Sequence, residues 1–267
     1  MNNELIYVYC ISNTPVILDS VLVHEGLKCV FFQEYYVVVK NVSPDEFSEE
    51  NLKKKFADLS WIDINARGHI EVISQIMKSC TVIPFKFGTI FKSEESLGKF
   101  ISDYSDSLKE NLINIEGKEE WSVKIYFDRK VLNEQIAELS EEVRNLEQQI
   151  SESSQGKGFI LKKKKNEIIE KEVEKVIKSC GQTCYDECKN ISELSRTNNL
   201  LPNELTERND DMILNVSFFI KKQRVVDFVN AVDLLQGKFN NIGFDIDVSG
   251  PWPPFSFVTV KEHFCNN

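Results

Sequence analysis

The residues of this chain whose types and spacing could do chemistry are three cysteines four positions apart, Cys180, Cys184 and Cys188. In a helix, steps of four place side chains along one face, so the three sulfur atoms would form a row. A structural zinc site needs four ligands, and no histidine or further cysteine lies near enough in the sequence to complete the set. The alternative is that the cysteines act as small apolar residues on the buried face of a helix. We favour this alternative and predict no metal site.

His69, in the run Arg67-Gly68-His69, is the other candidate for chemistry, as a general base. Such a base needs a nucleophile, and no serine or cysteine lies in a recognisable nucleophile motif. The glycine patterns that cradle phosphate groups, GxGxxG and GxxxxGK[ST], are absent as well. We therefore predict no catalytic residue and no cofactor, with His69 as a partly buried or surface helix residue. An enzyme that uses His69 or the cysteines is the minority alternative.

The charge of the chain limits its partners. The net charge is −10, from 42 acidic and 32 basic residues among 267. This balance disfavours nucleic acids and anionic membrane surfaces, which both attract basic proteins. No apolar run approaches the roughly 18 residues that span a bilayer, and the first residues lack the features of a signal peptide. Seven cysteines without an export signal indicate reduced thiols in a cytoplasmic protein.

The elements that must position these side chains begin with a mixed α/β domain, which we place at 1–117. Short apolar and aromatic runs predict strands at 5–11 and within 29–42, where either two short strands or one bulged strand fits the pattern. Helical patterning follows at 43–79, with a break expected near residues 60–61, and again at 93–115.

The run TVIPFKFGTIF, residues 81–91, lies between those helical regions, and we expect it to be an extended core strand. Phe85, Phe87 and Phe91 would then share one face, because successive residues of a strand alternate between faces. Gly88 permits a bend between the two halves.

The remaining residues, 118–267, are expected to form a second domain of α+β type. A strand at 120–128 leads into a helical hairpin at 131–195. After the hairpin we expect a polar loop, a strand, a helix and a last strand, at 195–211, 212–220, 223–235 and 243–248. This order is close to a ferredoxin-like fold with an antiparallel coiled-coil hairpin inserted at the first helix.

The hairpin is predicted from apolar residues that recur at steps of 4, 3, 4, 3 and 4, the spacing of a coiled-coil seam. These residues are Leu132, Ile136, Leu139, Val143, Leu146 and Ile150. The second helix, 159–194, is longer than the first, so its stripe either closes on the first helix or stays partly open for a partner helix. The four lysines at 162–165 are either an electrostatic docking patch or, as we favour, a solvated stretch balanced by the glutamates that follow.

Two aromatic motifs carry a resemblance to a known family. TVIPFKFGTIF followed by SEESL, and SGPWPPFSFV at 249–258, resemble the GvpF/GvpL family of gas vesicle proteins, as do YVYCI near the start and EGKEEWSVKIYFD in the middle. The resemblance covers essentially the whole chain. Three positions depart from the family pattern: Cys10 stands where glycine is expected, Lys86 where arginine is common and Phe255 where tyrosine is usual.

The resemblance implies a mixed α/β N-terminal domain and a ferredoxin-like C-terminal domain with a coiled-coil hairpin. It implies an accessory or minor component of gas vesicles, within the cytoplasm. Such a protein would bind the major hydrophobic shell protein and other accessory proteins, assist nucleation or assembly and limit aggregation. The alternative within the family is a purely structural wall component on the gas-facing side. No catalytic residues are associated with the family.

The two aromatic motifs supply the candidate partner-binding residues. They are Phe85, Phe87, Phe91, Trp252, Phe255 and Phe257. The three prolines of SGPWPPFSFV cannot donate to a strand ladder, so we expect them to end the last strand and turn the chain. The aromatic rings of this segment would then cover a sheet face or the domain junction, with part of their surface presented to a partner.

Overall fold

The computed structural model describes residues 4–259, apart from the side chain of Leu139, so that one position of the predicted seam lies outside the described residues. The chain groups into two compact units. Unit 1 runs to Glu120 and takes up the chain again at Pro251, whereas unit 2 is Trp121–Gly250. The expected boundary after residue 117 lies close to the first of these divisions. The segment from Pro251 onward, which we had placed in the second domain, groups with unit 1.

Unit 1 is built on an antiparallel sheet in the order β2-β3-β1-β4, with β5 also paired to β1. The strands are β1 Leu5–Ser12, β2 Leu27–Phe32, β3 Tyr35–Val42, β4 Ile83–Pro84 and β5 Ile90–Phe91. Of the two arrangements expected within 29–42, the structure has two strands. They form a tight hairpin in which Gln33 adopts a φ of 55°, the left-handed conformation that such turns need.

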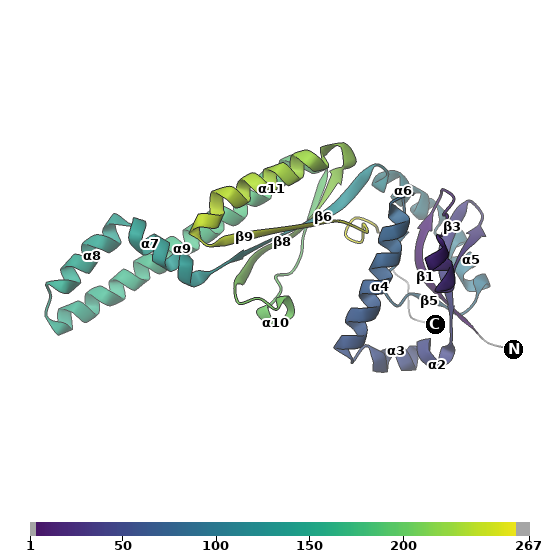
Figure 1. Cartoon of the computed structure of the whole chain (residues 1–267), viewed down its shortest axis with the longest axis horizontal. Coiled ribbons are helices and arrows are strands. Elements are labelled where there is room, and N and C mark those ends of the chain that lie inside the picture. Colours follow the sequence, from purple (N-terminus) through teal and green to yellow (C-terminus); the bar gives the residue numbers. More distant parts are fainter. Residues whose placement is uncertain (1–3, 260–267) are drawn as a thin grey trace. The chain divides into compact units, whose positions relative to one another are not determined.

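The helices of unit 1 are short apart from α4. They are α1 Ser20–His24, α2 Pro44–Phe47, α3 Glu49–Lys55, α4 Leu59–Met77, α5 Glu94–Asp103 and α6 Ser105–Ile115. The helical region predicted at 43–79 is divided in three, and the second division, between α3 and α4, lies close to the break expected near residues 60–61. The division before α4 has a local cause, because the Asp58 carboxylate accepts hydrogen bonds from the Ser60 and Trp61 amides and starts a new helix. In Figure 1, α4 and α5 lie to the two sides of the sheet.

The predicted strand at 81–91 is wrong in its middle. Only its ends pair with β1, as β4 and β5, and the chain between them turns, with the Thr89 amide bonded to the Lys86 carbonyl. Gly88 has a φ of +81°, which a side chain would strain. The turn rotates Phe87 away from its neighbours, so the three phenylalanines do not share a face.

Unit 2 is built on a four-stranded sheet in the order β7-β8-β6-β9. Its strands are β6 Lys118–Phe127, β7 Leu194–Thr197, β8 Asp211–Lys221 and β9 Phe244–Trp252, of which β6 and β9 continue into unit 1. Its helices are α7 Arg129–Leu139, α8 Glu141–Ser151, α9 Gln155–Ile191, α10 Asn203–Thr206 and α11 Val225–Phe239. When α7–α9 are counted as one helical part and the short α10 is left out, the order of elements is βαββαβ, which is consistent with a ferredoxin-like arrangement.

The helical hairpin projects from this sheet as an arm formed by α7, α8 and the first half of α9 (Figure 1). The first helix of the hairpin, predicted as continuous, is interrupted at Ser140, whose hydroxyl caps α8 through the Val143 amide at 3.3 Å. The Val143 and Leu146 side chains are buried, as the predicted seam requires.

The segment predicted as the polar loop 195–211 contains two regular elements, β7 and α10. The strand was missed because its residues, LSRT, are mostly polar and exposed, which leaves no apolar alternation to detect. Its hydrogen bonds to β8 define it instead.

β9 is an edge strand of its sheet and extends past the predicted end at 248 to include Pro251. Proline is tolerated there because an edge strand does not need every backbone donor. Part of this edge is covered, since the Gln236 side chain of α11 accepts a hydrogen bond from the Ile246 amide at 2.5 Å.

The aromatic segment after β9 is fixed to unit 1 by two buried polar side chains. The Glu120 carboxylate accepts hydrogen bonds from the Ser256 amide at 3.0 Å and from its hydroxyl at 2.6 Å. The Asn111 side chain of α6 bonds both to the amide and to the carbonyl of Thr259. The Phe255 ring packs against the core of unit 1. This segment is therefore part of the folded body of unit 1.

Candidate partner-binding site

Unit 1 contains a cleft of about 450 Å³ between the sheet and the helices α2 and α4. Strands β1 and β3 supply its floor, and its wall comes from the helices and from Phe87 of the turn. Its apolar lining residues are Tyr7, Tyr9, Val42, Phe47, Ile64, Val72 and Phe87. We call this hollow the aromatic cleft.

A bulge in β1 sets the orientation of the floor. The pairing of β1 with β3 shifts between Val8 and Cys10, which leaves Tyr9 as the extra residue. Because of this shift, Tyr7 and Cys10 both face α4: Tyr7 contacts His69, and Cys10 packs with Val72 and its neighbours. A regular strand would have turned one of them to the opposite face.

His69 lies at the bottom of the cleft and forms hydrogen bonds to both β1 and the segment that follows β4. Its Nε2 lies 2.8 Å from the Phe85 carbonyl, which can only accept, so Nε2 carries the proton. Nδ1 of the neutral ring is then an acceptor and receives the Tyr7 hydroxyl proton at 2.9 Å. The Tyr7 oxygen in turn accepts the Gly88 amide at 3.2 Å. This chain of bonds holds the turn of TVIPFKFGTIF against α4.

Burial favours the neutral forms of His69, Tyr7 and Tyr9. Burial lowers the pKa of His69, and this effect exceeds the opposing one of the hydrogen bond to the Phe85 carbonyl. Burial likewise raises the pKa of Tyr7 and, with a smaller contribution from the charge of Glu25, raises the pKa of Tyr9 to about 12. Both nitrogens of His69 are engaged, so no lone pair is available for a general base. His69 is placed to position the turn.

Aromatic rings continue from the cleft to its outer rim. The centroid of Phe87 lies 5.9 Å from those of Phe56 and Trp61. Next to these rings, Leu59 and Ile64 of α4 are 76% and 71% exposed. Lys55 lies over the Trp61 ring at 5.0 Å, a cation–π contact that adds one positive charge here. The cleft and this rim together form an apolar surface open to solvent.

Charged groups surround the cleft without pairing. Glu25, Glu46 and Lys40 line it. None of the three forms an ion pair within the described part of the chain. These two carboxylates and one ammonium give the edge of the cleft a net charge of −1.

The structure separates the six candidate partner-binding residues into three places. Phe87 lines the aromatic cleft. Phe85 and Phe91 pack with Phe100 of α5, with centroids 5.8 and 5.5 Å from it, away from the cleft. The other three lie at the end of β9 and just after it: Trp252, the last residue of β9, is 39% exposed, and Phe255 and Phe257 are half-buried. The structure does not bring the six together, and their role in binding stays a prediction.

Sequence reasoning missed most of the cleft. Tyr7, Tyr9, Phe47 and Ile64 were not candidates, although the spacing of the two tyrosines in YVY already placed them on one side of a strand. Phe47 and Ile64 belong to helices whose orientation depends on packing that the sequence alone does not specify.

The cysteine row is part of the core of unit 2. Cys180, Cys184 and Cys188 are fully buried among the apolar residues of that core. Burial raises the pKa of Cys188 to about 12, and a hydrogen bond with Cys184 together with burial raises that of Cys180. Within the described residues, no group of three or more histidines, cysteines or acids is arranged to hold a metal ion.

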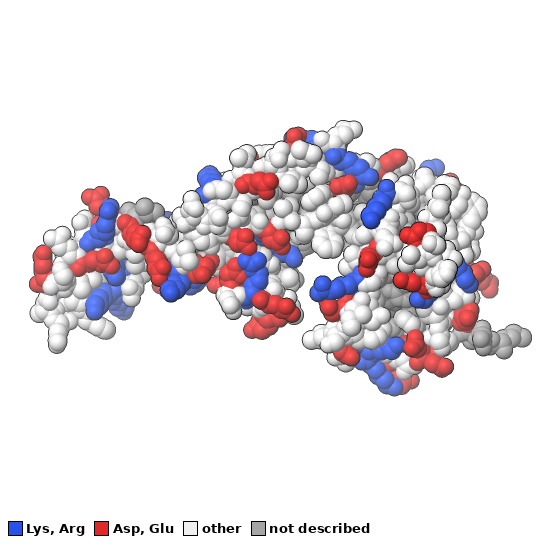
Figure 2. All heavy atoms as spheres, viewed as in Figure 1, with Lys and Arg blue, Asp and Glu red and all other residues white. Residues whose placement is uncertain are grey.

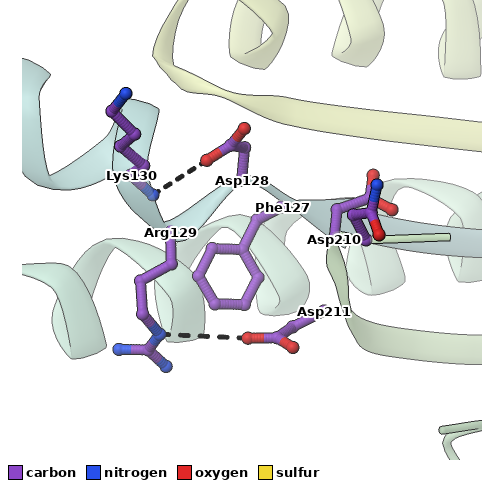
Figure 3. Close-up of a pocket in the computed structure, with 7 residues that line it drawn as sticks. Phe127, Asp128, Arg129, Lys130, Asp210 and Asp211 are labelled. Carbon is purple, nitrogen blue, oxygen red and sulfur yellow. Dashed lines mark hydrogen bonds and ion pairs between the residues drawn. The ribbon is translucent and has the colours of Figure 1, made fainter. Parts of the chain in front are cut away.

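A second hollow, of about 410 Å³, lies in unit 2 beside the start of α7 (Figure 3). Its three carboxylates all have partners. The Asp128 carboxylate accepts from the Lys130 amide at 2.8 Å, and Arg129 lies 3.8 Å from Asp211. Asp210 is paired with Arg208. We therefore do not regard this hollow as a candidate site.

No helix among the described residues has the length and apolar character that crossing a bilayer requires. Comparison with known proteins points to one family. The chain is similar to gas vesicle protein L of Streptomyces sp. strain CB03234, with 21% identity over 83% of this chain and 79% of that protein. It is similar to gas vesicle protein F of the same strain, with 23% identity over 78% of this chain and 80% of that protein.

The fold is that of a solved family member. The crystal structure of GvpF from Anabaena sp. PCC7120 superposes with a TM-score of 0.69 at 19% identity, covering 97% of this chain and all of that one. The family model described as gas vesicle synthesis protein GvpL/GvpF matches residues 5–259, which is nearly the whole chain. The chain therefore belongs to the GvpL/GvpF family of gas vesicle proteins.

Proposed function

We propose that this protein is an accessory or minor structural protein of gas vesicles that binds the major hydrophobic shell protein and limits its aggregation during nucleation and assembly. The observation that carries the proposal is the aromatic cleft with its exposed apolar rim. A solvent-exposed apolar surface of this kind is characteristic of a protein that binds apolar segments of a partner.

The physical task fits this surface. Shell subunits that bury much apolar area in a finished wall expose that area beforehand, so they aggregate when free. A partner covers the exposed area and adds solubilising charge. The net charge of −10 and the acidic and basic groups interspersed over the visible face supply that charge (Figure 2).

Phe87 and Ile64 are our proposed contacts to the shell protein, because both line the cleft and Ile64 is exposed on its wall. The five other candidate phenylalanine and tryptophan residues stay predictions. Further partners would be other gas vesicle accessory proteins, and the protein would act at the gas vesicle within the cytoplasm. We propose no enzymatic activity, since His69 is committed to hydrogen bonds on both sides.

The test is to dilute denatured shell protein into buffer with and without this protein and to follow light scattering. The native chain should suppress scattering and co-purify with the shell protein on co-expression. Ile64→Asp should weaken both effects, because it places a charge on the wall of the cleft without disturbing buried packing.

Ile113→Asp is the matched control, since Ile113 is 62% exposed on α6 and does not line the cleft. Equal loss in both variants would argue against the cleft as the binding site, and absence of any association would overturn the proposed function. Proteomics of washed, intact vesicles then separates the two family roles. A wall component stays with the vesicles, whereas a transient assembly factor is washed away.

A further inference from the structure

The tip of the α8–α9 hairpin exposes two large apolar side chains. Phe159 and Ile160 are 73% and 69% exposed. Their neighbour Gly158 is buried, and a Cβ placed there would lie 3.9 Å from the Ile150 carbonyl of α8. Successive helix residues are about 100° apart, so Phe159 points to the side of the face that Gly158 turns to α8 and Ile160 points away from it. Two large apolar side chains exposed side by side form a contiguous apolar surface, the kind of feature that marks an interaction site.

The same tip carries positive charge without partners. Lys157, Lys162, Lys163 and Lys164 are exposed, and none of them forms an ion pair within residues 4–259. Lys165 alone of the nearby lysines pairs across the hairpin, with Glu147 at 3.0 Å. Figure 2 shows basic groups along the lower edge of the arm, over α9. A basic apolar tip on a protein of net charge −10 is complementary to an acidic apolar hollow.

The aromatic cleft of unit 1 is such a hollow. Its floor and wall are rings and aliphatic side chains, and two unpaired carboxylates, Glu25 and Glu46, stand at its edge. Lys40 is the one opposing charge in the lining. Its volume, about 450 Å³, can accept two apolar side chains of this size.

We infer that the hairpin tip of one copy of this protein docks into the aromatic cleft of a second copy. Phe159 and Ile160 enter the cleft, and the lysines next to them lie opposite Glu25 and Glu46. The contact joins two different surfaces, so each dimer keeps one free tip and one free cleft and further copies add in the same direction. The self-association does not depend on the proposed client. If the proposed function holds, client and second copy compete for one cleft.

The test uses two variants that each keep one half of the contact. The tip variant is Phe159→Ser with Ile160→Ser, and the cleft variant is Ile64→Asp with Glu25→Lys and Glu46→Lys. All these residues are exposed, so the fold should be retained, which circular dichroism checks. Sedimentation equilibrium gives the mass of each variant alone and of their mixture.

We expect the native chain to show a mass that rises with concentration. Each variant alone should be monomeric, with a dissociation constant raised about tenfold or more, equivalent to about 1.4 kcal/mol. The mixture should form a one-to-one complex, because one variant supplies an intact tip and the other an intact cleft. Raising the salt concentration should weaken native self-association, since exposed charges are screened. Val226→Ser with Leu234→Ser, which removes two exposed apolar residues of α11, should leave the association unchanged.

Other outcomes would overturn the inference. A native chain that is monomeric at every concentration rules out the contact while leaving the client test untouched. Association of the cleft variant alone would indicate a tip-to-tip dimer instead. Binding of the tip to vesicles of anionic phospholipid, lost in the tip variant with no change in self-association, would assign the tip to a membrane surface.

Discussion

Replacing His69 with phenylalanine tests the hydrogen-bond chain that organises the aromatic cleft. The substitution keeps a flat ring in the buried site but removes both nitrogens. Tyr7 loses the acceptor of its hydroxyl and the Phe85 carbonyl loses its donor, while the Tyr7 oxygen still accepts the Gly88 amide. Each buried group left without a partner costs about 1–3 kcal/mol. Because two groups are affected, we expect unit 1 to lose about 2–6 kcal/mol in total.

The loss should depend on pH in a defined direction. Burial places the pKa of folded His69 below its unfolded value of about 6.5. As the pH falls below about 6.5, the unfolded chain therefore takes up a proton that the folded chain does not, and native stability decreases until the lower folded pKa is reached. Above about 6.5 the contribution is complete. In the phenylalanine variant this part of the pH profile should be flat.

Hydrogen exchange followed by mass spectrometry is the appropriate assay, because two units need not unfold in one step. Peptides from β1 and from the turn at 86–89 should lose protection in the variant, whereas peptides of unit 2 should not. Tyr7→Phe completes a double-mutant cycle. The double variant should lose less stability than the sum of the losses in His69→Phe and Tyr7→Phe, since both substitutions remove the same hydrogen bond. Native protection of unit 1 in the phenylalanine variant, or an unchanged pH profile, would refute the assignment of His69 as a neutral clamp.

Three further predictions concern packing elsewhere. Gly88→Ala should lower the free energy of unfolding of unit 1 by about 1–3 kcal/mol, because φ is +81° and the new Cβ would lie 2.9 Å from the Phe56 ring. The melting temperature should fall, and an unchanged melting temperature would contradict this prediction. Glu120→Ala should remove the acceptor of two hydrogen bonds from Ser256 and so speed proteolysis of the segment after β9. Equal cleavage rates would show that this carboxylate does not hold the segment. The three α9 cysteines should resist alkylation until unit 2 unfolds, whereas the half-buried Cys29 and Cys80 should react before them, as peptide mapping would show. Early labelling of the three would place the row outside the core.

The sequence allowed the main elements to be predicted where apolar spacing was regular. The hairpin followed from the steps between Leu132 and Ile150, and the strand β8 from its apolar run. The interruption at Ser140 could not be found from spacing, because the apolar steps continue across it and only the capping bond reveals the new helix. Strand β7 has no apolar pattern, so its pairing to β8 defines it.

The candidate site was predicted only in part, for a physical reason. Phe87 was a candidate because an aromatic motif contains it, but the motif was interpreted as one strand. The positive φ of Gly88 and the bond from its amide to Tyr7 reorient that ring, and both depend on residues about eighty positions apart. Glycine at this position signalled a bend, but not the direction in which the bend turns the ring.

Unit 2 is inserted in the sequence of unit 1, and this has a consequence for biosynthesis. The ribosome delivers the first 120 residues early, yet the segment that bonds to Glu120 and Asn111 begins only after Gly250. At typical elongation rates of about 5–20 residues per second, this last piece follows on the order of ten seconds later. During that interval the Glu120 carboxylate and the Asn111 side chain cannot make these bonds and are available to water. The contacts of Glu120 and Asn111 can therefore form only after unit 2 has been synthesised.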